Sequence, residues 1–266
     1  MKKRYDAYAN YYYKYNKKSK IKTKLLIILF CLFTIMVVVF FSISFSNFLT
    51  ISKIVNVNSN YIYENRTLYA LSLYSSNNKT EVNTYSDNIK KQGGAGYVYK
   101  NNDIYYVLSS IYKSSGEANK VKNNLQENGV NSEIIKIEIP AINIKATLTT
   151  NSSKILSEGV GLFYNNYSDL YNLSVEFDKQ NIDTIKAKSK INDMYNQNLK
   201  IVQNFSNYFN QSTNVYILYV KIYLNKLNSV INDLLNLDDS ENLSSSIKGT
   251  YCNIIGEYLN LYKEML

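Results

Sequence analysis

The chain has 266 residues, 45% of them hydrophobic, which is enough for a membrane segment and one or two folded units of ordinary size. Its formal net charge of +9 would suit nucleic-acid binding, but nine cations and one anion fall within residues 1–24, so the rest of the chain is almost neutral. A neutral body lacks the basic surface that neutralises phosphates, so we expect no nucleic-acid partner. The absence of His also excludes Ser–His–Asp triads, Cys–His pairs and His-based zinc sites.

A basic tail over residues 1–24 precedes an uncharged, apolar segment over 25–46, and no charge follows until Lys53. The segment is long enough to cross a bilayer as a helix. A cleaved signal peptide is the alternative, but the apolar run is too long for one and no A-x-A-like site follows it. The positive-inside rule places the tail in the cytoplasm. The sequence therefore predicts a single-pass anchor in the lipid bilayer of the cell membrane, with a linker over 47–66 and extracytoplasmic domains after it.

The segment 67–139 contains an internal repeat. Residues 69–72 (Tyr-Ala-Leu-Ser) are echoed by 106–109 (Tyr-Val-Leu-Ser), and each copy continues with apolar residues at helical spacing and a glycine, Gly93 or Gly129, suited to a helix end. Two strand–helix–strand units explain this pattern. The product is an α+β domain of βαββαβ, ferredoxin-like topology, with two helices on one face of a four-stranded antiparallel sheet and the other face open. The expected strands are 68–74, 96–100, 104–109 and 133–138, and the expected helices are 79–92 and 115–128.

Both halves of this segment resemble a SPOR domain. In the second half, over residues 105–118, a strand, an aromatic residue, a short loop and the pair Glu117-Ala118 at the start of a helix follow in the order of the family. The resemblance implies that the open sheet face binds peptidoglycan glycan strands that lack stem peptides, in cell division or sporulation. It also implies that Ser75 and Tyr105 correspond to ligand-contacting positions.

Strand alternation assigns side chains to the two faces of the sheet. Leu71, Val98, Leu108 and Ile134 are expected to face the helices, which places Ala70 on the open face together with the candidate ligand-binding residues Ser72, Tyr74, Tyr97, Tyr99, Tyr105 and Ser109. Exposed tyrosines offer flat apolar surfaces for sugar rings. The alternative is that they reflect only the 27 tyrosines of the chain and the preference of strands for Tyr. We favour binding for the cluster, with Ser75 included from the resemblance.

The C-terminal part has a helical period. After Pro140 and a connector over 140–152, apolar stripes run over about 155–177, 182–209, 213–237 and 243–262. Four helices with short connections predict an all-α antiparallel bundle over 153–266. We interpret its stripes as core and assign them no ligand.

These patterns predict a non-enzymatic, membrane-tethered protein of the cell envelope that binds peptidoglycan glycan strands. No catalytic residue, metal site or cofactor is expected. The alternative is an envelope scaffold or assembly protein that uses the sheet and the bundle for protein–protein contacts, with an envelope protein as the partner of the bundle.

Overall fold

The computed structural model describes residues 57–62, 65–238 and 242–266, which belong to one compact unit, Asn56–Leu266. The basic tail and the predicted membrane segment 25–46 lie outside the described residues. Within the described ranges, no helix combines the length and the apolar character needed to cross a membrane.

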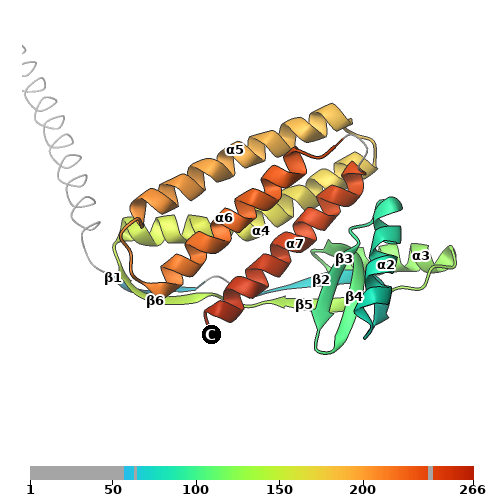
Figure 1. Ribbon diagram of the computed structural model, residues 1–266, viewed down its shortest axis with the longest axis horizontal. Helices are drawn as coiled ribbons and strands as arrows, with labels where there is room; N and C mark the ends of the chain where they lie inside the picture. Colours follow the sequence, from blue (N-terminus) through green and yellow to red (C-terminus); the bar gives the residue numbers. More distant parts are fainter. Residues whose placement is uncertain (1–56, 63–64, 239–241) are drawn as a thin grey trace, which may run out of the picture. The chain divides into compact units, whose positions relative to one another are not determined.

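A four-stranded antiparallel sheet forms the first half of the unit (Figure 1). Its strands occur in the order β3-β4-β2-β5, and their bounds are β2 (Arg66–Ser76), β3 (Tyr97–Asn101), β4 (Ile104–Tyr112) and β5 (Glu133–Ile139). Helix α2 (Lys79–Lys91) joins β2 to β3, and helix α3 (Ser115–Glu127) joins β4 to β5. The predicted βαββαβ order is therefore confirmed.

Local capping explains where these two helices begin and end. The side chain of Asn78 accepts a hydrogen bond from the backbone N–H of Thr80, and Ser114 caps α3 in the same way through the N–H of Glu117. Gly93 and Gly129 follow the helices with φ of +84° and +77°, a conformation that side chains with a Cβ rarely adopt.

A two-stranded ribbon continues the sheet beyond Pro140. Strand β1 (Val57–Ile62) pairs antiparallel with β6 (Asn143–Leu148), so that Val57 lies opposite Leu148. Both strands fall in segments predicted as a linker and a connector. The ribbon extends the pairing of β2 with β5, which ends with Arg66 opposite Ile139, and Figure 1 shows the two pairs following one another.

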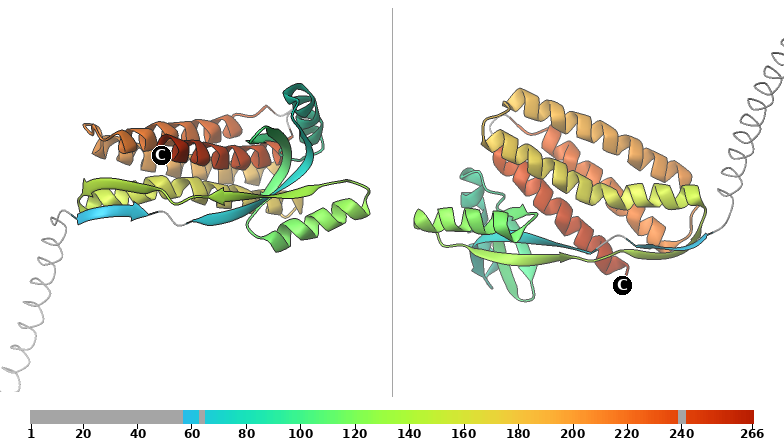
Figure 2. Two further views of the ribbon diagram at one scale, coloured as in Figure 1. Left: turned by 90° about the horizontal axis from the view of Figure 1, so that it is seen from below. Right: turned by 180° about the vertical axis from the view of Figure 1, so that it is seen from behind.

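Four long helices form the C-terminal half, as predicted. They are α4 (Thr150–Asp178), α5 (Thr184–Tyr208), α6 (Val215–Leu235) and α7 (Leu243–Glu264). Successive helices run in opposite directions (Figures 1 and 2). Each begins after a polar cap, and the four caps are Thr149, Asp183, Asn214 and Asn242.

The sheet and the bundle share one hydrophobic core. Leu108 and Ile111 of β4 and Ile137 of β5 are buried in the same cluster as Phe163 of α4 and Tyr251 of α7. Figure 2 shows α3 on one side of β2 and β5 and the bundle on the other. The face that was predicted to be open is therefore covered. Its apolar side chains explain why, since leaving them in water would forfeit the free energy of their burial.

A smaller core lies under α2. Val82 and Ile89 of this helix are buried against Val107 of β4. Val107 and Leu108 are adjacent and both fully buried, so β4 is covered on both faces. The prediction that Leu108 faces α2 and α3 is wrong, because Leu108 joins the core shared with the bundle.

Candidate ligand-binding groove beside strand β3

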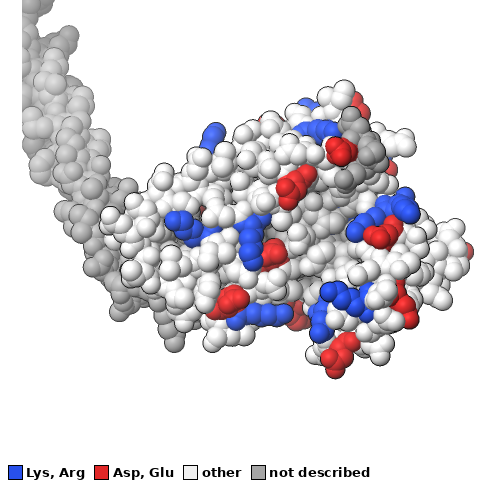
Figure 3. Space-filling view, in the orientation of Figure 1, with Lys and Arg blue, Asp and Glu red and all other residues white. Residues whose placement is uncertain are grey.

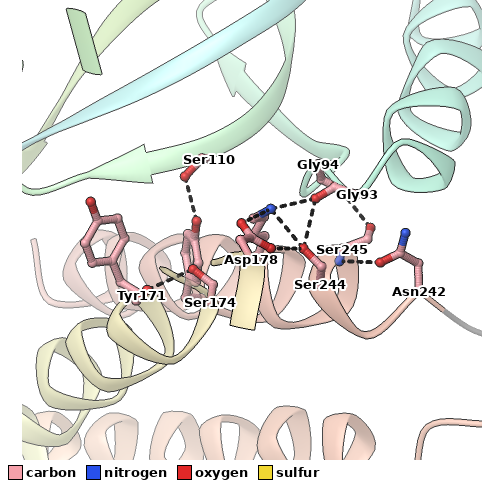
Figure 4. Close-up of polar contacts among 11 residues, drawn as sticks. Gly93, Gly94, Ser110, Tyr171, Ser174, Asp178, Asn242, Ser244 and Ser245 are labelled. Carbon is pink, nitrogen blue, oxygen red and sulfur yellow. Dashed lines mark hydrogen bonds and ion pairs between the residues drawn. The ribbon is translucent and has the colours of Figure 1, made fainter. Parts of the chain in front are cut away.

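Helix α7 is held against the sheet by polar contacts as well as by the core (Figure 4). The hydroxyl oxygens of Ser110 and Tyr251 lie 2.6 Å apart in a buried position. At the start of α7, Ser245 donates to the carbonyl of Gly94 at 2.7 Å, and Lys248 donates to that of Gly93 at 2.8 Å. These contacts join the loop after α2 to the bundle, so α7 packs against the sheet as part of the same folded domain.

Two of the candidate residues lie on the α2 side of the sheet. Tyr74 stacks on Tyr85 of α2 with ring centroids 4.3 Å apart, and its hydroxyl donates to Glu81 at 3.2 Å. This bond to a carboxylate raises the pKa of Tyr74. Tyr105 packs against the small core under α2. The predicted face of both residues is therefore wrong.

The pairing register of β2 and β4 explains why the faces of Tyr74 and Tyr105 were predicted wrongly. Strand β2 has irregularities between Leu71 and Ser72 and between Ser72 and Tyr74, and each one displaces the alternation of side chains. In β4, Leu108 lies opposite Tyr97 on the bundle side, which directs its neighbour Val107 toward α2. Because both faces of β4 are apolar, its hydrophobic pattern does not distinguish them.

The three candidate serines lie away from the groove beside β3. Ser72 is buried and donates to the carbonyl of Tyr74 at 2.9 Å, and Ser109 donates to the carbonyl of Leu71 at 3.2 Å. Ser75 is exposed, and it lines a shallow hollow together with Ser72 and Tyr74. The structure therefore separates the serines from the tyrosines Tyr97 and Tyr99.

Tyr97 and Tyr99 point away from α2 and α3, as predicted, but they meet α7 rather than open solvent. Both are partly buried against the shared core. They line a groove of about 610 Å³ whose other wall is the second half of α7. The further residues around it are Val98, Lys100, Glu138, Pro140, Gly256, Leu259, Asn260, Tyr262, Lys263 and Leu266.

A second hollow of about 560 Å³ adjoins this groove. Tyr97 and Val98 line both, and the second hollow lies between α2 and the first half of α7. Its polar residues include Asn83, Asp87 and Lys90 of α2 and Asn253 of α7. We call the two hollows together the β3 trough. The trough therefore lies between β3, which is an edge strand of the four-stranded sheet, and α7, and it reaches Glu138 and Pro140 at the end of β5.

Two glycines of α7 allow β3 to come close. A Cβ on Gly256 would lie 2.1 Å from the hydroxyl oxygen of Tyr97, and one on Gly249 would lie 3.3 Å from the carbonyl oxygen of Ala95. Gly249 and Gly256 are seven residues apart and so share a face of the helix. This seven-residue spacing of two glycines is the signal in the sequence from which the close approach of β3 to α7 could have been predicted.

The hydroxyls of Tyr97 and Tyr99 stay protonated at neutral pH. Burial, followed by the acidic groups of Cys252 and Glu257, raises the pKa of Tyr97 to about 12. Burial also raises the pKa of Tyr99. Both side chains therefore present a neutral hydroxyl and an aromatic ring to the groove. The charged groups at its rim are Lys100, Glu138 and Lys263.

Comparison with known proteins identifies part of the chain. Residues 65–136 match the family model of the SPOR domain. A similar solved structure is the peptidoglycan binding domain of the B. subtilis cell wall lytic enzyme CwlC, with 16% identity and a TM-score of 0.25 over 28% of this chain and 95% of that domain. No curated protein matches the chain significantly. The expected SPOR domain is thus confirmed for residues 65–136, whereas the helical bundle lies outside the matched segment.

Proposed function

We propose that this protein is a non-enzymatic, membrane-tethered protein of the cell envelope that binds peptidoglycan glycan strands in the β3 trough, in cell division or sporulation. The observation that carries the proposal is that a SPOR domain keeps an aromatic groove beside β3 although its central sheet face is buried. Leu108 and Ile111 at the centre of that face are inaccessible, so the trough is the part of it that a ligand can reach.

The lining of the trough suits a chain of sugars. Tyr97, Tyr99 and Tyr262 supply rings that can pack against the apolar faces of pyranoses, while Asn253 and Asn260 can bond to hydroxyls. The outer edge of β3 adds backbone N–H and C=O groups that no further strand of the four-stranded sheet pairs with. Two hollows in succession favour a linear ligand over a compact one.

The cations at the rim match the chemistry of a stripped glycan. Removal of the stem peptide by an amidase leaves a lactyl carboxylate on each muramic acid. Lys100 and Lys263 stand at the groove next to α7, and Lys90 at the hollow next to α2. Ammonium–carboxylate contacts at these places would favour glycan without stem peptides over intact peptidoglycan.

A pull-down with purified sacculi tests this function. We expect residues 56–266 to bind amidase-treated sacculi more tightly than intact ones. Tyr262→Ala should reduce binding several-fold to about tenfold, since an aromatic face contributes about 0.5–1.5 kcal/mol beyond its area. Tyr85→Ala is the control, because Tyr85 is an exposed aromatic ring on α2, outside the trough. Loss of binding in Tyr85→Ala but not in Tyr262→Ala would move the site to the α2 side.

The tether is proposed from the sequence. The segment 25–46 would anchor the chain, with the basic tail in the cytoplasm and residues after about Asn47 outside. Replacing the five lysines nearest the segment by Glu should invert or impair insertion; they are Lys17, Lys18, Lys20, Lys22 and Lys24. Unchanged protease accessibility of the C-terminal part in intact cells would contradict the orientation.

The burial of the central sheet face favours a second candidate, an envelope scaffold. A domain whose usual ligand face serves as core for a bundle could present its outer surface to an envelope protein. Failure of residues 56–266 to bind either form of sacculus, with the fold intact by circular dichroism, would support the scaffold.

A further inference from the structure

The first two turns of α6 carry apolar side chains on the surface. Val215, Leu218 and Ile222 are 48%, 39% and 51% exposed, and their spacing places them on one side of the helix. Tyr208, at the end of α5, is also exposed. These four residues, here called the α6 patch, form an apolar surface that nothing in the described part of the chain covers.

The apolar character is confined to this end of α6. Further along the same exposed side the residues are Asn225, Ser229 and Asp233. The core side of the helix remains apolar throughout, with Val220, Leu227 and Leu234 among its buried residues. The change from apolar to polar on the solvent side therefore does not follow from packing within the bundle.

The α6 patch lies at the end of the unit where the described chain begins. Val57 of β1 pairs with Leu148 of β6, and the next residue, Thr149, has its hydroxyl 3.3 Å from that of Tyr208. Figures 1 and 2 show the start of α6 beside β6. About ten residues, 47–56, separate Val57 from the apolar segment, and an extended chain of that length spans at most roughly 35 Å.

Charge is scarce at this end. Residues 146–153 and 205–220 contain no Lys, Arg, Asp or Glu, and Lys221, next to Ile222, is the one charged residue in the first two turns of α6. In Figure 3 the surface over the first turn of α6 is white, whereas charged side chains are drawn over other parts of the same face. A surface with a single lysine can approach a bilayer with little desolvation of ions, because a lysine side chain is long enough to keep its ammonium group in water.

We propose that the α6 patch rests on the lipid surface of the membrane that holds segment 25–46. The inference rests on the proposed membrane anchor. The short connection concentrates the patch at the bilayer, so a small apolar area is sufficient for contact that it could not achieve in free solution. The contact would orient the unit with α6 at the membrane and hold the β3 trough in a constant position relative to it.

The absence of Trp from the chain makes a clean test possible. Leu218→Trp places a single reporter in the patch. Ile185→Trp is the control, because Ile185 is 81% exposed in the first turn of α5, at the opposite end of that helix from Tyr208. Each full-length variant is reconstituted into vesicles containing lipids brominated near the headgroup end of their acyl chains. We expect the emission of Leu218→Trp to be quenched and that of Ile185→Trp to be unaffected.

The possible outcomes distinguish a failure of the lipid contact from a failure of the membrane anchor. If the full chain floats with the vesicles in alkaline carbonate but neither reporter is quenched, the anchor holds and the lipid contact is refuted. If the chain does not float, both are refuted. A blue shift of Leu218→Trp emission that depends on protein concentration and not on brominated lipid would assign the patch to a second copy of the chain and overturn the lipid contact.

Discussion

Tyr97 of β3 lies so close to Gly256 of α7 that a Cβ at position 256 would be 2.1 Å from its hydroxyl oxygen and 3.2 Å from Cζ. We therefore expect Gly256→Ala to destabilise the unit by roughly 1–3 kcal/mol, the usual cost of overpacking a close contact. Urea unfolding of residues 56–266 measures this. In the Tyr97→Phe background the same substitution should cost less, since the nearest atom is gone.

A matched glycine supplies the control. Gly161 in α4 has no neighbouring atom within 4 Å of an added Cβ. Gly161→Ala should therefore stabilise the unit by about 0.5–1 kcal/mol through helix propensity. If Gly256→Ala also stabilises the protein, the close approach of β3 to α7 is not present in solution.

The buried contact between Ser110 and Tyr251 predicts coupling between the sheet and the bundle. Tyr251→Phe should leave the Ser110 hydroxyl buried without this partner, at a cost of about 1–3 kcal/mol in the free energy of unfolding. Adding Ser110→Ala should recover part of the loss. A double-mutant cycle by chemical denaturation measures the coupling, and purely additive effects would contradict it.

The shared core predicts that the sheet and the bundle unfold together. Leu108→Ala should remove about 2–5 kcal/mol through a cavity in that core. Because Leu108 packs with the bundle, the substitution should shift the loss of helix and the loss of near-ultraviolet tyrosine signal to the same lower urea concentration. Two separate transitions, with only the sheet affected by the substitution, would show that the sheet and the bundle do not unfold as one unit.

Buried tyrosines predict sensitivity to alkaline pH. The pKa of Tyr97 is raised from 10.0 to about 12, chiefly by burial, so the folded state holds this proton more tightly than the unfolded state. The corresponding stability is complete below pH 10 and is lost as the pH rises from about 10 toward 12. Burial also raises the pKa of Tyr251. Urea unfolding at pH 9 to 11.5 should show the decline, and Tyr97→Phe should reduce its slope.

The elements of this protein could be predicted from its sequence because the signals are local. Helical spacing, caps such as Asn78 and Ser114, and terminal glycines such as Gly93 act within one or two turns of the chain. The repeat in the middle third then implied a βαββαβ order, and the SPOR resemblance followed from the same residues. The β1–β6 ribbon escaped prediction because each strand is short and acquires its partner only across the whole domain.

Only the tertiary structure decided which surface is open. The sequence placed Tyr97 and Tyr99 away from α2 and α3, yet their neighbour is α7, more than a hundred residues away along the chain. Tyr105 was assigned to the wrong face because Val107 and Leu108 are both buried, so apolar pattern alone does not orient β4. An apolar stripe shows that a surface must be covered. Which element covers that surface depends on which distant part of the chain fits against it closely enough to exclude water from both surfaces.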